Sequence, residues 1–170
     1  MIANKLDGIG VCMIGVCMKS CKFCNNENNR IVFRGKFWTL AFHKQDYLGR
    51  CVLYTNRHVD NFNELYDSEL VDMRNMLAGV EKELKDLFGC TMLNWCCNMN
   101  NVYAEENPEP HVHIHIRPRY KEEVNVNGIV YHDKEFGSHY DRKAPVQFDE
   151  DTIKYIYKQM KGNFEKYYEK

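Results

Sequence analysis

The alternation of apolar and polar residues along the chain predicts a series of short strands. Runs in which apolar residues recur at every second position are typical of strands with one buried face. By this pattern we expect strands over residues 31–33, 36–42, 51–55, 91–98 and 111–117. Two further apolar runs flank Asn127-Gly128, a dipeptide that favours tight turns, so residues 124–131 are expected to form a hairpin.

Three other segments are expected to be helical. A long helix begins at Asp67-Ser68-Glu69, carries apolar residues at helical spacing and ends before Gly89, a C-terminal cap. A second long helix runs from its N-cap Asp149 to Tyr168, and a short one covers residues 61–65. These elements predict an α+β fold: an antiparallel sheet of about five strands with a long helix packed across it, plus a C-terminal helical extension.

Composition and charge exclude several classes of function. The 170-residue chain carries 23 Lys and Arg against 24 Asp and Glu, a net charge of −1, so it has no general basic field and no nucleic-acid partner is expected. No apolar run is long enough to span a membrane, and the first 18 residues lack the features of a signal peptide. We therefore expect a cytoplasmic protein without a membrane partner, whose eight cysteines are thiols or metal ligands.

The most informative segment alternates histidine with apolar residues from His111 to Ile116. Residues two apart in a strand point to the same face, so His111, His113 and His115 share one face of the sheet. Such a face can bind a catalytic metal, bind phosphate when an imidazole is protonated, or supply a nucleophile. The three histidines alone do not decide among these chemistries.

With its neighbouring motifs, this segment resembles the histidine triad (HIT) superfamily, whose signature is His-x-His-x-His with apolar residues between. The Cys21-x-x-Cys24 pair, the tripeptide Asn56-Arg57-His58 and the ending Arg117-Pro118-Arg119-Tyr120 look like the zinc-containing bacterial branch. In that branch the fold is the α+β arrangement expected above.

The resemblance covers part of the chain and divides it into three segments. Residues 20–120 are expected to form the HIT domain, and residues 1–19 an N-terminal arm. Residues 121–170 would be a C-terminal extension that contains the hairpin and the last helix. Because HIT proteins usually pair through the long helix and the fourth strand, a homodimer is expected.

The resemblance assigns roles to the three histidines. His113 would attack the α-phosphorus of a nucleotide that carries an anhydride, ester or amide leaving group, and water or phosphate would release the nucleotidyl-histidine. His115 would bind phosphate oxygens, and His111 completes the catalytic triad. Asn100 stands at the family's phosphate-binding amide position. The implied activity is that of a nucleotide hydrolase or transferase, for example a diadenosine polyphosphate hydrolase.

The chain departs from the family just before the triad. Asn107 and Pro108 replace Gln followed by Ser or Thr; Asn107 could do part of the work of the Gln, but Pro108 has no hydroxyl for a leaving group. The glutamates around them disfavour a polyphosphate or favour a cationic leaving group. Arg117 replaces an apolar residue; it either adds a phosphate contact on the triad face or is exposed at the end of the strand.

Related zinc-bearing proteins take their ligands from the Cys-x-x-Cys motif, a histidine after the third strand and the first triad histidine. On this chain those positions are Cys21, Cys24, His58 and His111. Four nitrogen and sulfur ligands close a tetrahedral site, so the zinc would be structural. The alternative is a pair of buried thiols and an unliganded histidine.

The resemblance also places a nucleoside in an apolar slot beside the early strands. Trp38 is a candidate lining residue, and Asp46 lies where a carboxylate could meet the ribose hydroxyls. His43 is expected to be exposed.

Two functions from other classes remain open at this stage. One is a nucleotide-binding or interaction protein with little or no turnover, which Pro108 and the acidic residues around it favour. The other is a metal-dependent hydrolase that uses all three triad histidines as ligands, whose activity would vanish with a chelator and return with metal.

Overall fold

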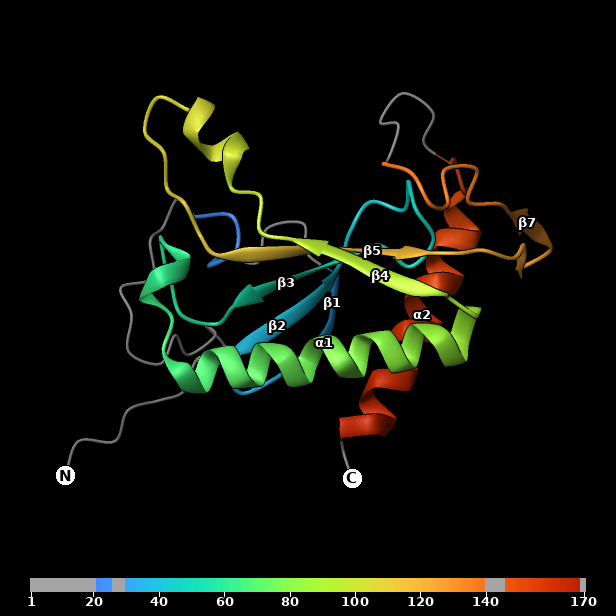
Figure 1. Ribbon diagram of the computed structural model, residues 1–170, viewed down its shortest axis with the longest axis horizontal. Helices are drawn as coiled ribbons and strands as arrows, with labels where there is room; N and C mark the ends of the chain where they lie inside the picture. Colours follow the sequence, from blue (N-terminus) through green and yellow to red (C-terminus); the bar gives the residue numbers. More distant parts are fainter. Residues whose placement is uncertain (1–20, 26–29, 140–145, 169–170) are drawn as a thin grey trace.

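A five-stranded antiparallel sheet forms the centre of the protein (Figure 1). The computed structural model describes residues 21–25, 30–139 and 146–168. The strands lie in the order β1-β2-β3-β5-β4, and all neighbours are antiparallel. Their bounds are β1 (Arg30–Arg34), β2 (Trp38–Phe42), β3 (Cys51–Thr55), β4 (Met92–Cys96) and β5 (His113–Arg119). The expected α+β fold is therefore confirmed.

Two helices cover one face of this sheet. Helix α1 (Asp67–Phe88) runs across it, and α2 (Glu150–Tyr168) packs against β1 and α1 (Figure 1). The remaining elements are two 3₁₀ turns and a hairpin: η1 (Phe62–Glu64), η2 (Asn100–Ala104), β6 (Val124–Val126) and β7 (Ile129–Tyr131). No helix within the described ranges is long and apolar enough to cross a membrane.

The alternation of side chains along the strands separates a core face from a site face. Leu40, Leu53 and Ile114 come from three adjacent strands, and all three are completely buried in the main core. The helices complete this core with apolar side chains that include Val80, Leu84, Ile156, Met160 and Phe164. The opposite face carries the smaller cluster of Ala41, Val52 and Tyr54.

The sequence signals for element ends are confirmed by specific hydrogen bonds. Gly89 caps α1 in the left-handed conformation, with φ of 67°, and its N–H bonds the Lys85 carbonyl at 2.9 Å. At the start of α2, the Asp149 carboxylate accepts from the N–H of Thr152 at 2.7 Å. The Asn127-Gly128 turn joins β6 and β7 as expected, with φ of 52° and 84°.

The triad strand begins two residues later than expected, so His111 lies just before β5. This approach segment is held by neighbouring backbone: the N–H of Val112 bonds the Val59 carbonyl at 2.8 Å, and the N–H of Thr55 bonds the Val112 carbonyl at 3.3 Å. His111 is therefore fixed between β3 and the loop that follows it, rather than within the regular sheet.

The segment after residue 120 packs into the same core as the rest of the chain. A buried ion pair anchors its first loop, because Arg119 donates to the Asp133 carboxylate at 2.7 Å and 3.1 Å with both side chains almost fully buried. The same guanidinium donates to the carbonyls of Ser138 and Glu135. One arginine on β5 thus organises the loop over residues 133–138.

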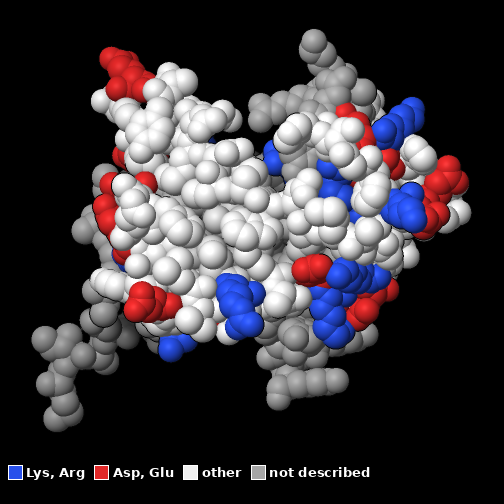
Figure 2. Space-filling model, viewed as in Figure 1, with Lys and Arg blue, Asp and Glu red and all other residues white. Residues whose placement is uncertain are grey.

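The outer surface of β4 and α1 is apolar near its centre. Trp95 and Met92 on the edge strand are 52% and 44% exposed, and Leu77 and Leu93 line a shallow groove beside Trp95. Figure 2 shows few charged side chains over the middle of this face, with Lys and Arg mixed among Asp and Glu toward its margin. The expected homodimer stays a prediction, and this is the surface through which it would form.

Removal of the buried Asp133 carboxylate should destabilise the whole fold. Asp133→Ala leaves the Arg119 guanidinium buried without its carboxylate partner, which typically costs about 3–5 kcal/mol. We expect the free energy of unfolding, measured by urea denaturation, to fall by that amount. Asp151→Ala is the control, since its carboxylate is 88% exposed and the change should stay within about 0.5 kcal/mol. Equal effects of the two variants would contradict this role.

Candidate functional site

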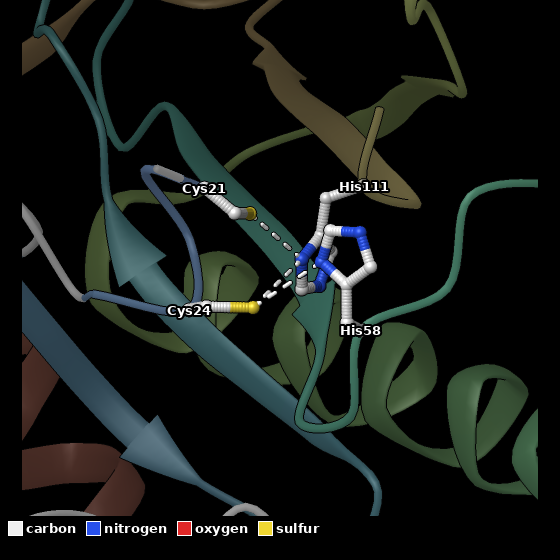
Figure 3. Close-up of side chains that lie close together, drawn as sticks. All are labelled: Cys21, Cys24, His58 and His111. Atoms are coloured by element: carbon white, nitrogen blue, oxygen red, sulfur yellow. Dashed lines mark hydrogen bonds between the residues drawn. The ribbon is translucent and has the colours of Figure 1, made fainter. Parts of the chain in front are cut away.

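A cluster of two cysteines and two histidines lies beside the start of β5 (Figure 3). Cys21 and Cys24 share one short turn, which is closed by the Asn25 N–H bonding the Cys21 carbonyl at 3.0 Å. The Cys21 Sγ lies 3.3 Å from His111 Nδ1, and the Cys24 Sγ lies 3.3 Å from His58 Nδ1. All four candidate ligand atoms lie within 4.8 Å of one another.

Hydrogen bonds on the far side of each imidazole fix which nitrogen faces the thiols. The Nε2 of His111 lies 2.9 Å from the Thr55 carbonyl, which can only accept, so Nε2 carries the proton. The Nε2 of His58 lies 2.7 Å from the Asp60 carboxylate in the same way. Both Nδ1 lone pairs therefore point into the cluster. Burial lowers the pKa of His111 to about 4, which keeps this imidazole neutral.

The loop that carries His58 is fastened to α1. Arg57 donates to both carboxylate oxygens of Glu69 at 2.7 Å and 2.8 Å, and Glu69 is almost completely buried. The Asn56 side chain holds the other side of the loop through the Gly35 carbonyl at 2.9 Å. The position of His58 thus depends on contacts made by its two preceding residues.

The four side chains suit a metal ion. Neutral imidazoles and deprotonated cysteine thiolates are the donors that tetrahedral zinc sites use, and a carbonyl or carboxylate behind each histidine is typical of such sites. The structure brings together all four residues that the resemblance implies. These residues could hold a metal, and every described member of the cluster is buried or half-buried.

Beside the cluster, a cavity of about 330 Å³ opens over the triad. His111, His113 and His115 form its floor, while Lys22 and Phe23 line one wall. The opposite wall comes from the segment between β4 and β5, with Asn98, Met99, Asn101, Val102, Glu105 and Glu109. The rings of His113 and His115 lie edge to face, with centroids 4.8 Å apart.

The tautomer of His113 is fixed by its own chain. Its Nδ1 lies 2.8 Å from the carbonyl of His111, an acceptor, so Nδ1 carries the proton and Nε2 keeps a lone pair. Burial lowers the pKa of His113, which favours the neutral ring. An oriented neutral imidazole with one available lone pair is what a nucleophilic histidine requires.

A fourth histidine stands at the cavity, and sequence reasoning missed it. His43 was expected to be exposed, but it is half-buried, and its ring centroid lies 5.9 Å from that of His115. The signal was present in β2, since Thr39, Ala41 and His43 alternate with Trp38, Leu40 and Phe42. Continuing that alternation one residue past the strand places His43 on the triad face.

The loop after β2 keeps His43 in place. The Gln45 amide donates to the carbonyls of His43 at 2.9 Å and Arg50 at 2.7 Å, and it accepts from the N–H of Gly49. Gly49 has φ of 73°, and a Cβ there would lie 3.0 Å from Leu84, so this tight return requires glycine.

His43 and His115 are both neutral near pH 7. Burial, followed by nearby charges that include Arg50 and Arg117, lowers the pKa of His43 to about 4 and that of His115 to about 3. Each has a buried Nδ1 without a hydrogen-bond partner among the described residues. These two nitrogens can exchange hydrogen bonds with a ligand in the cavity.

Arg117 is on the triad face, as the alternation of β5 indicates. Its side chain is largely buried, and its Nη1 lies 3.7 Å from the Cys96 Sγ. It lowers the pKa of both His43 and His115, so its positive charge acts on this part of the cavity. The alternative that Arg117 is exposed at the end of the strand is therefore wrong.

Two residues that were expected to contact a nucleoside make other contacts instead. Trp38 is completely buried, and its indole N–H donates to the Glu69 carbonyl at 2.8 Å, so it packs in the core and cannot line a slot. The reason is that its position in β2 points to the helix-covered face. Asp46 is paired with Arg50 at 2.5 Å, and both side chains are largely buried.

Two predicted polar contacts also lie away from the cavity. Asn100 is exposed and absent from the cavity wall, which uses Asn98 and Asn101 instead. Asn100 starts the η2 turn, where successive side chains rotate by about 120°, so a shift of one residue changes the direction of the amide. Asn107 is exposed, while its neighbours Glu105 and Glu109 line the cavity.

Comparison with known families and structures gives a consistent result. The HIT domain family model matches residues 27–122. A search of curated proteins finds no match.

Several solved structures share the fold. A hypothetical histidine triad nucleotide-binding protein of Sulfolobus tokodaii aligns with a TM-score of 0.59 at 15% identity, over 85% of this chain and 89% of that one. A zinc-bound histidine triad family protein of Mycobacterium smegmatis gives 0.58 at 12% identity, over 87% and 95%. Diadenosine triphosphate hydrolase of Plasmodium falciparum, in complex with cyclomarin A, gives 0.51 at 16% identity, over 80% and 76%.

Proposed function

The chain belongs to the HIT family, and we propose that it is a nucleotide hydrolase or transferase that works through a covalent nucleotidyl-His113. The observation that carries this proposal is the hydrogen bond from His113 Nδ1 to the His111 carbonyl, which leaves the Nε2 lone pair available in the cavity. The fold shared with a diadenosine triphosphate hydrolase supports the same class of reaction.

The proposed reaction has two steps at the α-phosphorus. The Nε2 lone pair of His113 forms an N–P bond while the P–O or P–N bond to the leaving group breaks. The leaving group keeps that electron pair, and an amine leaving group takes a proton from solvent as it departs. The imidazole then carries a positive charge, which the His111 carbonyl stabilises by accepting from Nδ1. Water then attacks phosphorus and loses a proton to solvent while the N–P bond breaks and its electron pair returns to Nε2, which releases nucleoside monophosphate and neutral His113.

Neighbouring groups would stabilise the charge that develops on phosphorus. His115 and His43 offer neutral imidazoles beside the cavity, and Asn98 and Asn101 offer amides from the opposite wall. The Arg117 guanidinium adds a fixed positive charge close to both histidines. Donors and charges held in place before the reaction stabilise a transition state at little reorganisation cost. Asn100, Asn107 and Asp46 would contribute only if these segments rearrange on binding.

We further propose that the Cys21, Cys24, His58 and His111 cluster holds a structural zinc ion. Four donors fill the coordination shell, so the ion would stabilise the fold rather than bind substrate. The zinc-bound histidine triad protein of Mycobacterium smegmatis shares the fold and supports this proposal.

The acidic cavity wall suggests the nature of the leaving group. Glu105 and Glu109 line the cavity, and Lys22, the one cation in the described lining, is already paired with Glu105 at 3.1 Å. Because the imidazoles are neutral, a polyphosphate would bring several negative charges against this wall. An amine leaving group of a nucleoside phosphoramidate would meet favourable charge instead.

A second candidate function is nucleotide binding with little or no turnover. Pro108 favours it, since this residue has no hydroxyl to assist a departing group.

The localisation and assembly remain proposals as well: a cytoplasmic homodimer joined through α1 and β4. Sedimentation velocity that gave a monomer at micromolar concentration would argue against the dimer.

Release of nucleoside monophosphate tests the main proposal. Wild type should release AMP from diadenosine polyphosphates or from an adenosine phosphoramidate, and His113→Ala should lose at least about 1,000-fold in rate, because the nucleophile is gone. His132→Ala is the matched control, since His132 is exposed and away from the cavity. Nucleotide binding by wild type without any AMP release would favour the second candidate.

Metal analysis tests the zinc site. Purified protein should contain one zinc per chain, and Asp60→Asn should weaken zinc binding by about 10–100-fold, because it removes the carboxylate behind His58. A colorimetric chelator measures the loss. Cys97→Ser serves as a control, because that thiol is outside the cluster. Full zinc retention by Cys21→Ser/Cys24→Ser protein would exclude the assigned ligands.

Charge removal tests the leaving-group argument. Glu109→Gln should raise kcat/KM for a diadenosine polyphosphate relative to an amine-bearing phosphoramidate by about five- to tenfold, roughly 1 kcal/mol at an effective dielectric constant near 20. Glu106→Gln, an exposed neighbour outside the cavity lining, should leave the ratio unchanged. The same ratio in both variants and wild type would show that the wall does not select the leaving group.

A further inference from the structure

The turn that carries Cys21 and Cys24 also reaches the cavity. Between the two cysteines stand Lys22 and Phe23, and both line the cavity wall. Lys22 pairs at 3.1 Å with Glu105, which also lines the cavity. Phe23 points toward the triad. One short turn therefore contributes two candidate metal ligands and two parts of the substrate cavity.

The Phe23 ring packs directly on His113. The ring centroids are 4.8 Å apart with an interplanar angle of 34°. Phe23 also lies 4.9 Å from the ring of Tyr54, which is the register partner of His113 on β3, and it joins the small cluster of Ala41 and Val52. Phe23 thus covers His113 and Tyr54 together on this face of the sheet.

The packing of Phe23 restrains the imidazole of His113, which its single hydrogen bond does not hold firmly by itself. The second side-chain torsion of histidine has broad, roughly two-fold preferences, so an imidazole can flip and exchange the positions of its nitrogens. The hydrogen bond to the His111 carbonyl favours one orientation of His113. The Phe23 ring lies against the face of His113 and hinders rotation of the imidazole out of its plane, so the ring keeps the orientation that this hydrogen bond sets.

The attachment of Phe23 depends on the two cysteines. The Lys22–Glu105 pair is exposed, with side chains 72% and 50% accessible, and such pairs contribute little. The stronger attachment is the Cys21 and Cys24 contact with His58 and His111, which a bound metal would turn into coordinate bonds. The metal would thereby hold the turn, and the turn would hold Phe23 on His113.

We propose that Phe23 is a positioning residue for His113 and that it couples occupancy of the Cys21, Cys24, His58 and His111 site to ligand binding at the triad. The nucleophilic role of His113 rests on the proposed function, whereas the coupling does not require turnover. Coupling between two sites is reciprocal, so a nucleotide bound against His113 must stabilise the metal by the same factor by which the metal favours the nucleotide.

Equilibrium competition for zinc with a colorimetric chelator measures this coupling directly. We expect saturating AMP to raise the zinc affinity of the wild-type protein by about fivefold or more, the lower range of typical coupling between sites. In Phe23→Ala and Phe23→Leu the ratio of the zinc affinities with and without AMP should fall to near one, because both lack the ring. Phe23→Tyr, which keeps the ring, should restore it. Asn25→Ala, an exposed position at the end of the same turn and outside the cavity lining, is the matched control and should keep the wild-type ratio.

Steady-state kinetics separate positioning from substrate contact. Loss of the ring should lower kcat by about tenfold and leave KM within about twofold, since the nucleophile is misaligned while the substrate contacts remain. A raised KM with unchanged kcat would mean that Phe23 contacts the nucleotide itself, and the positioning role would be overturned. A wild-type zinc affinity that AMP does not change would overturn the coupling.

The two proposals can fail separately. If wild type binds AMP and shows the AMP effect on zinc affinity but turns over no substrate, the coupling stands and the enzymatic function fails. If wild type is active and AMP has no effect on zinc affinity, the enzymatic function stands and the coupling fails.

Discussion

One residue, His111, belongs both to the Cys and His cluster and to the histidine triad. Its Nε2–H is held by the Thr55 carbonyl, which directs Nδ1 at the cysteines, and its own carbonyl accepts from His113 Nδ1. The ring therefore belongs to the Cys and His cluster, while the backbone sets the tautomer of the next triad histidine. A displacement of His111 would disturb both sites at once, which explains why its approach to β5 is fixed by backbone hydrogen bonds on both sides.

This arrangement gives the three triad histidines different tasks. His111 points to the cysteines, His113 is oriented by a carbonyl, and the pKa of His115 is lowered most strongly by its surroundings. Among the described residues, the group able to hold a metal includes His111 but neither His113 nor His115. A hydrolase that used all three imidazoles as ligands would need them to converge on one ion, so this geometry argues against that alternative.

The parts of the fold that could be predicted from sequence depend on local rules. Alternation along strands, the Gly89 cap and the Asn127-Gly128 turn act within a few residues and were read correctly. The errors concern the direction of side chains at positions where a strand ends or a turn begins. His43 lies one residue beyond β2, so the alternation had to be continued past the strand end to place it, whereas Asn100 begins a 3₁₀ turn, whose period differs from that of a strand. The Asp46–Arg50 pair depends on a loop whose path the sequence does not specify.

The segment after residue 120 supports the site from the far side of the sheet. Its helix α2 places Tyr157 against Phe42, with ring centroids 5.4 Å apart, and the Tyr157 hydroxyl donates to the Ile31 carbonyl at 2.9 Å. These contacts hold β1 and the end of β2, and His43 follows directly after β2. Because β1 is an edge strand, it would otherwise be held on one side only. The extension therefore stabilises the strand end that carries His43 to the cavity, although it contributes no residue to the triad.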